Sequence, residues 1–165
     1  MNELGNILDA IGHAPITKRA ITNHGVLNEA YAYAKPSSFS RGMRIDIGGV
    51  AILLISGTAS IDENGKSVHI GDFGAQLRRT FENITGLLAS EGATWHDVAR
   101  TTCYLRDIER DYDLFNAGRT EFFKEQGLDP LPASTGIQAI LCRPELLVEI
   151  EGIAMFRTDK AGGGK

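Results

Sequence analysis

Hydrophobic residues recur along the chain with two different periods, which predict helices and strands in alternation. One predicted helix, from about residue 73 to 91, carries apolar side chains at i, i+4, i+7 and i+11: Leu77, Phe81, Ile84 and Leu88. We expect Gly92 to end this helix, because glycine readily takes the left-handed conformation that follows a helix C-terminus.

A second helix is predicted between Asp111, as its N-cap, and Gly127, which would end it. One face is marked by Tyr112, Phe115, Arg119, Phe122 and Phe123. Pro130 and Pro132 then predict an extended passage into the last segment of the chain.

Three segments have the composition or alternation of strands. Residues 48–57, GGVAILLISG, form a continuous apolar run between glycines, which is typical of a strand buried on both faces. Residues 98–106 are rich in β-branched and aromatic residues. In residues 146–156 the even-numbered positions from Leu146 to Phe156 would face one side of a sheet and the odd-numbered positions the other. Asn64-Gly65 predicts a hairpin turn after the first strand.

The order hairpin, helix, strand, helix, strand predicts an α+β sandwich in which two helices pack on one face of a mixed sheet. We expect one domain over residues 37–157, an N-terminal extension of uncertain structure over residues 1–36, and a mobile tail over residues 158–165. Leu147, Ile153 and Met155 would then lie on the uncovered face, where another chain is expected to cover them.

Glu149 and Glu151 share that face, where an unpaired carboxylate is costly. One interpretation is that they pair with Arg100 or Arg106 of the central strand, or with another subunit. The other is that they belong to a functional site. A glycosidase pair is disfavoured, because no cluster of sugar-binding aromatic residues accompanies them.

The composition and charge of the chain limit the classes of binding partner that we expect. The net charge of −4, without any basic run, argues against a nucleic-acid partner. The longest apolar run is too short to span a bilayer and the first residues do not resemble a signal peptide, so we expect a cytoplasmic protein without a membrane partner. Cys103 and Cys142 are expected to be reduced, and neither has the spacing of a metal site. We expect no metal and no cofactor.

Several short motifs follow one another in order over roughly residues 39–157: Ile55-Ser56-Gly57-Thr58, Gln76 and Asn83 of the first helix, Asp97-Val98, Tyr104-Leu105-Arg106-Asp107, Phe115-Asn116, Phe122-Phe123, Pro132-Ala133 and residues 148–154. In this order the motifs resemble the RidA/YjgF family. The resemblance implies a chorismate-mutase-like fold, assembled as a homotrimer with small-molecule clefts between subunits. Active members of this family are enamine/imine deaminases.

The resemblance also implies a site for a small-molecule carboxylate. Glu151 corresponds to the carboxyl group that positions or activates water, Ser56, Gly57 and Thr58 to the cleft floor, and Phe39 to an aromatic wall.

The chain departs from the family pattern directly after Pro-Ala, where the usual arginine is Ser134, and two residues later, where Gly136 replaces a cysteine. Loss of one bidentate contact weakens carboxylate binding by about 1.5 to 3 kcal/mol, or roughly 10- to 150-fold. Arg41 and Arg143 are candidates to replace the charge. Asn116 and Glu149 complete the predicted binding residues.

Three functions therefore remain open: hydrolysis of enamines or imines to 2-oxo acids and ammonia, metabolite binding without turnover, and a reaction like that of chorismatases. The last rests on residues 132–151 and on Ser37 to Gly42, which look like parts of those enzymes, although chorismatases are about twice as long. The older description of the family as endoribonucleases gains no support from the acidic charge balance.

Overall fold

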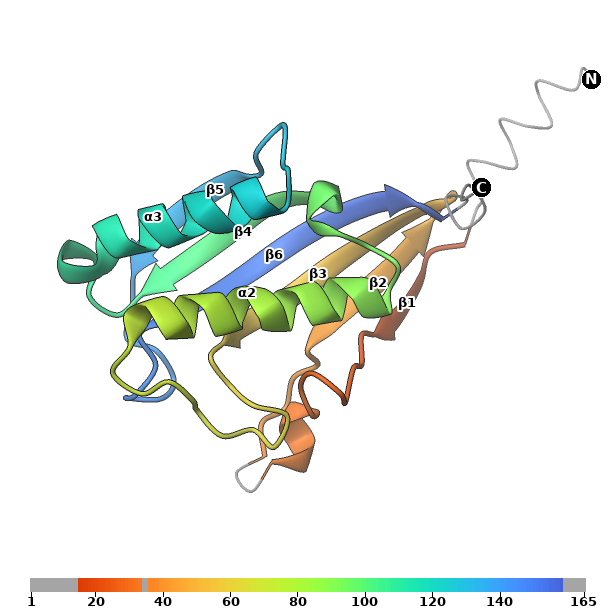
Figure 1. Cartoon of the computed structure of the whole chain (residues 1–165). Helices are drawn as coiled ribbons and strands as arrows, with labels where there is room; N and C mark the ends of the chain where they lie inside the picture. The colour runs from red at the N-terminus through yellow and green to blue at the C-terminus, as the bar shows by residue number, and fades with distance from the viewer. Residues whose placement is uncertain (1–14, 34–35, 159–165) are drawn as a thin grey trace, which may run out of the picture.

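The computed structural model describes residues 15–33 and 36–158, in which six strands form one sheet and two long helices cover one of its faces (Figure 1). The helices are α2 (Phe73–Ser90) and α3 (Ile108–Glu125), and η1 (Ala30–Ala32) and η2 (Trp95–Asp97) are single 3-10 turns. The strands are β1 (Thr17–Ala20), β2 (Gly42–Ile47), β3 (Val50–Ala59), β4 (Val98–Leu105), β5 (Ala133–Gln138) and β6 (Val148–Arg157).

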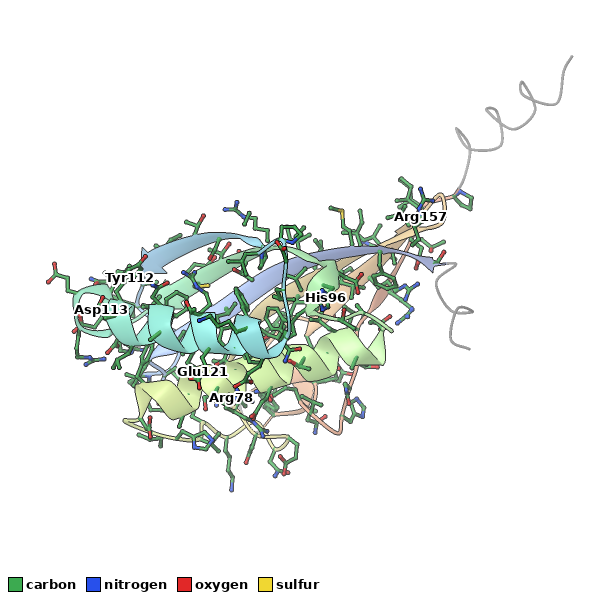
Figure 2. The ribbon with its side chains drawn as sticks, turned by 45° about the horizontal axis from the view of Figure 1, so that its top comes forward. Arg78, His96, Tyr112, Asp113, Glu121 and Arg157 are labelled. Carbon is green, nitrogen blue, oxygen red and sulfur yellow. The ribbon has the colours of Figure 1, made fainter. Side chains whose placement is uncertain are left out.

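The sheet order is β1-β2-β3-β6-β4-β5, and its neighbouring strands are antiparallel except for β4 and β5. The sheet is therefore mixed, and the predicted α+β arrangement is confirmed. The long strand β6 runs from the end of the sheet near Tyr112 and Asp113 of α3 to the opposite end at Arg157 (Figure 2).

The layer between the helices and the sheet holds an aromatic cluster. Phe81 of α2 stacks on Phe122 of α3 with ring centroids 4.4 Å apart, and Trp95 meets both rings edge-on. The Trp95 indole also donates a hydrogen bond to Thr85 Oγ1 at 2.8 Å, so its polar atom is satisfied although the ring is buried. The sequence placed α2 correctly, and Gly92 follows it with a φ of 73°.

Two local predictions are wrong. The run 48–57 does form a strand, β3, which begins at Val50 after the turn of Gly48 and Gly49, both with positive φ. This strand is not buried on both faces, however, since Leu54 is 40% exposed where no helix covers the sheet. The N-cap of α3 is Asp107, which accepts from the Arg110 backbone N–H at 3.0 Å.

The predicted turn after β3 and the predicted exposed side chains of residues 146–156 are confirmed, with Leu147 as an exception. The segment after β3 turns at Gly65, which has a φ of 80°, while a short antiparallel bridge joins Ile61 to Ser67. On the uncovered face of the sheet, Ile153 is 36% and Met155 is 49% exposed, as the alternation predicted. Leu147 instead packs half-buried against the core.

Part of the predicted N-terminal extension belongs to the sheet. β1 pairs antiparallel with β2, with Thr17 opposite Asp46 and Ala20 opposite Met43. Residues 1–14 and 159–165, which include nearly all of the predicted tail, lie outside the described residues. Within the described part of the chain, no helix is both long and apolar enough to cross a membrane.

Candidate functional site

A cavity of about 430 Å³ lies where β3 and β6 meet Tyr33, the segment 37–41 and the segment 142–146. It brings together seven of the residues that the sequence singled out: Phe39, Arg41, Ser56, Gly57, Arg143, Glu149 and Glu151. Tyr33, Ser37, Ala59, Ile61, Cys142 and Leu146 complete its lining. These residues are up to 118 positions apart in the chain (33 to 151), so the cavity is a product of the tertiary fold.

A bulge in β3 forms the floor of this cavity. Ile55 pairs with Gly152 and Thr58 with Ile150, so that Ser56 and Gly57 together face the single residue Glu151 of β6. The Ser56 hydroxyl donates to Ser40 O at 2.7 Å, and the Ser56 N–H donates to Arg41 O at 3.1 Å. The bulge therefore also holds the segment that carries Phe39 and Arg41.

Arg41 is buried, with only 3% of its surface exposed. Its guanidinium donates to Asn28 O at 3.0 Å and to the Tyr33 hydroxyl, and it lies 4.8 Å and 5.2 Å from the ring centroids of Tyr33 and Phe39. Burial lowers the Arg41 pKa, although the charges of Tyr33 and Glu29 act against this. No carboxylate of the described residues forms a salt bridge with Arg41.

Glu29 is a buried carboxylate whose charge acts on Arg41. This side chain is only 2% exposed, and neither carboxylate oxygen has a hydrogen-bond partner among the described residues. Its charge acts on Arg41 and Tyr33 without a hydrogen bond to either side chain.

Arg143 enters the same cavity on the loop before β6. Its Nη1 donates to Gly65 O at 2.8 Å and to Ser67 Oγ at 3.2 Å, and its guanidinium lies 5.9 Å from the Tyr33 ring centroid. The loop is held from two sides. Gln76 of α2 bonds Glu145 O and the Leu147 N–H, and Arg106 donates to the carbonyls of Leu141, Arg143 and Leu146. Such fixed loops position a side chain precisely enough for binding.

The two carboxyl groups have different surroundings. Glu149 packs directly on Gly57, so closely that a Cβ at position 57 would overlap its carboxyl oxygen. Burial first, and then the charge of Glu151, raise the pKa of Glu149. Glu151 lies beside Tyr104 of β4, whose own pKa is raised by burial and then by the charge of Glu151 and a hydrogen bond to it.

The predicted pairing of these glutamates with Arg100 or Arg106 is wrong within the described chain. Arg106 is used by the loop carbonyls, and Arg100 Nη2 donates to Thr135 Oγ1 at 2.9 Å. The cavity thus presents two guanidinium groups and two carboxyl groups, none of which forms a salt bridge with another residue of the described structure.

The remaining predicted site residues lie elsewhere. Thr58 does not line the cavity; it is buried at the end of the β3 bulge, where its hydroxyl donates to Ser56 O at 2.8 Å. Asn116 and Ser134 line a separate cavity between α3 and β5. Gly136 lies on β5 outside both cavities, with no atom within 4 Å of a Cβ built there.

Sequence reasoning missed Tyr33, Tyr104 and Cys142. Tyr33 falls in the N-terminal extension, whose structure the sequence left uncertain, and Tyr104 was considered only as part of the predicted strand over residues 98–106. Cys142 is exposed and lines the cavity, but it shares no spacing with another potential ligand. Among the described residues no group of three or more His, Cys, Asp or Glu side chains is placed to hold a metal.

Comparison with known proteins gives a consistent picture. Residues 32–156 match the family model described as Endoribonuclease L-PSP. Over 103 residues the chain is 36% identical to the 3-aminoacrylate deaminase RutC of Acinetobacter baylyi, which covers 62% of this chain and 78% of RutC.

Solved structures share the fold. The Rid-family protein YyfA of Yersinia pestis aligns with a TM-score of 0.66 and 27% identity, covering 84% of this chain and 98% of YyfA. The YjgF gene product of Escherichia coli aligns with a TM-score of 0.67 and 24% identity, covering 84% of this chain and 99% of YjgF. The chain therefore belongs to the Endoribonuclease L-PSP family, which is the RidA/YjgF family.

Proposed function

We propose that this protein hydrolyses the enamine or imine form of a small 2-amino acid product to a 2-oxo acid and ammonia. The observation that carries the proposal is the cavity in which two arginines without salt-bridge partners among the described residues face two glutamates of β6. The similarity to RutC, named as a 3-aminoacrylate deaminase, supports the same class of reaction.

In this proposal the arginines bind the substrate carboxylate. Arg143 is half-buried and Arg41 is buried, so both act in an environment where a charge-assisted contact is stronger than in water. Phe39, Ile61 and Leu146 supply apolar surface for the rest of the substrate.

The glutamates divide the proton transfers between them. Glu149 keeps its proton to a higher pH than an ordinary glutamate because its pKa is raised, so it can protonate C3 of an enamine to give the iminium ion. Water then adds to the iminium carbon and loses a proton to the Glu151 carboxylate, which gives a carbinolamine. Glu151 returns that proton to the nitrogen, the hydroxyl gives its proton to the Glu149 carboxylate, and the C–N bond breaks to release ammonia and the 2-oxo acid, so that both glutamates regain their starting states.

We further propose that the protein is a homotrimer. The exposed apolar side chains of the uncovered sheet face, Leu54, Ile153 and Met155, support burial against other copies. The cavity opens near this face, because Glu151 also lines a smaller hollow with Leu54, Arg100 and Ile153. In such an assembly the cavity would lie at or near a subunit boundary.

A coupled assay tests the function. A pyridoxal-phosphate-dependent lyase generates 2-aminoacrylate or 2-iminobutyrate, and the disappearance of the imine is followed with and without this protein. Glu151→Gln should lower the rate about 10²- to 10⁴-fold, as expected for loss of a general base. Glu121→Gln, an exposed glutamate on α3, is the matched control and should retain the rate (Figure 2).

The assay also separates the other functions. Saturable binding of 2-oxo acids without any turnover would refute the deaminase proposal in favour of a binding protein. Release of pyruvate from chorismate, with no effect on imines, would refute it in favour of a chorismatase-like reaction.

A further inference from the structure

A second cavity of about 430 Å³ lies between the C-terminal half of α3 and the segment that leads into β5. It is lined by Asn116, Arg119, Thr120, Phe123, Lys124, Leu128, Leu131, Pro132 and Ser134. Two of these lining residues are cationic and none is acidic. The cavity therefore has a positive lining on a chain whose net charge is negative.

The Arg119 guanidinium is fixed in this cavity from three sides. Its Nη1 donates to Ser134 Oγ at 3.1 Å, its Nη2 donates to Asn116 Oδ1 at 2.8 Å, and its Cζ lies 4.7 Å from the ring centroid of Phe115. These contacts use two of the five N–H donors of the guanidinium. Among the described residues no carboxylate forms a salt bridge with Arg119.

The Ser134 hydroxyl lies beside the Arg119 guanidinium. Its Oγ accepts from Arg119 and from Thr101 Oγ1, each at 3.1 Å, which leaves the serine proton for Cys103 Sγ or for a ligand. Cys103 Sγ lies 3.9 Å from Ser134 Oγ, and burial raises the pKa of that thiol. The thiol therefore stays neutral, and it does not supply the anion that Arg119 lacks.

Arg78 shows how another arginine that lies over an aromatic ring differs from Arg119 in its salt-bridge partners. Arg78 of α2 also lies over an aromatic ring, that of Phe122, at 5.5 Å, but its guanidinium pairs with Glu125 at 2.6 Å and Glu82 at 3.3 Å. Arg119 instead has neutral oxygen acceptors that orient it without neutralising it. A planar, oriented and unneutralised guanidinium suits bidentate binding of a carboxylate.

We infer that Arg119, with the Ser134 hydroxyl and Lys124 nearby, binds the carboxylate of a small organic acid in this second cavity. Position 134 itself carries no charge, and Arg119 delivers a guanidinium to it from the neighbouring helix. The inference rests on the proposed function for the identity of the acid, a 2-oxo or 2-imino acid, but the binding site itself is defined by these contacts alone.

Binding of 2-oxobutyrate to the full chain tests the inference without any turnover. The dissociation constant is measured by NMR titration from the amide shifts of α3 and β5, so that binding in the first cavity is not counted, for Arg119→Ala, Arg119→Lys and, as the matched control, Arg78→Ala. We expect Arg119→Ala to weaken binding roughly 10- to 150-fold, from the loss of one charge-assisted bidentate contact. Arg119→Lys should weaken it less, and Arg78→Ala should leave it unchanged.

A double variant distinguishes lost charge from lost structure. Adding Ser134→Arg to Arg119→Ala places a guanidinium on the adjacent position and should recover at least part of the affinity, while the melting temperatures of all variants are compared. Unchanged binding in Arg119→Ala, or equal weakening in Arg78→Ala, would overturn the inference. So would inorganic phosphate competing as well as 2-oxobutyrate, since the site would then not be selective for carboxylates.

The two proposals can fail separately. Turnover that depends on Glu151, together with 2-oxobutyrate binding that is indifferent to Arg119, would refute this inference alone. Binding that depends on Arg119, without imine hydrolysis by the wild-type protein, would refute the deaminase proposal alone.

Discussion

Replacement of Gly57 by alanine tests how the cavity holds its buried carboxyl group. A Cβ at this position would overlap Glu149 Oε1 and lie 3.0 Å from Cδ and 3.4 Å from Cγ of the same side chain. Normal carbon–carbon contacts are about 3.5 to 4.0 Å, so the Glu149 carboxyl group must move by on the order of 1 Å. Gly136 on β5 offers a control, because a Cβ added there would have no atom within 4 Å.

The expected magnitudes follow from this geometry. Overpacking costs about 1 to 3 kcal/mol, whereas glycine to alanine within a strand returns about 0.5 to 1 kcal/mol of backbone entropy. Gly136→Ala has only the gain in backbone entropy, because no atom lies close enough to its added Cβ to cause overpacking. The difference in unfolding free energy between the two variants should therefore be about 1 to 3 kcal/mol. A displacement of about 1 Å at a reacting group lowers turnover by roughly 10²-fold.

Two measurements check the displacement. Chemical denaturation gives the difference in unfolding free energy between Gly57→Ala and Gly136→Ala, and the coupled imine assay gives their rates. Carboxyl ¹³C NMR adds a readout that needs no turnover: the pKa of Glu149 should fall toward its ordinary value in Gly57→Ala, because the group leaves its buried position.

The reasoning would be refuted by a Gly57→Ala variant in which the Glu149 pKa stays raised and the imine assay matches that of Gly136→Ala. That result would mean that the close packing of Glu149 on Gly57 does not set the position of the carboxyl group. Loss of activity in both variants would equally contradict it, since Gly136 lines neither cavity.

Three further predictions address stability and assembly. Asn83 is 1% exposed and links α2 to the end of β3 by donating to Ala59 O at 3.0 Å and to Ile61 O at 2.9 Å. Asn83→Ala should lower the free energy of unfolding by about 2 to 4 kcal/mol in chemical denaturation, whereas Asn64→Ala, at an exposed position, should change it little. Because the folded-state pKa of Glu149 is raised, its contribution to stability is complete below the unfolded pKa and is lost as the pH rises through the folded pKa. Glu149→Gln should therefore gain stability relative to wild type as the pH rises from about 4 to about 8, and a pH-independent difference in melting temperature would contradict this. Ile153→Glu places a charge on the uncovered sheet face and should reduce a trimer to monomers in light scattering, whereas an unchanged mass would refute burial of that face.

The amino-acid sequence by itself determined the local elements whose signals are periodic. The spacing of Leu77, Phe81, Ile84 and Leu88 fixed α2, and the alternation in residues 146–156 placed both glutamates of β6 on the uncovered face. Such patterns are readable because the 3.6- and 2-residue periods belong to the backbone itself. Asp107 was missed as the cap of α3 because Asp111, four residues later, has the same side chain and an equally plausible helix to cap.

The grouping of the functional residues was decided only by the tertiary structure. Arg41 and Arg143 were individually indistinguishable from surface arginines, and they meet at Tyr33 because the β3 bulge and the loop bonded by Gln76 and Arg106 bring their segments together. Arg119 was assigned to a helix face, but its contact with Ser134 depends on how α3 lies against β5. Contacts of this kind join residues far apart in the chain, and the free energy that selects them comes from packing of the whole core, so no local pattern records them.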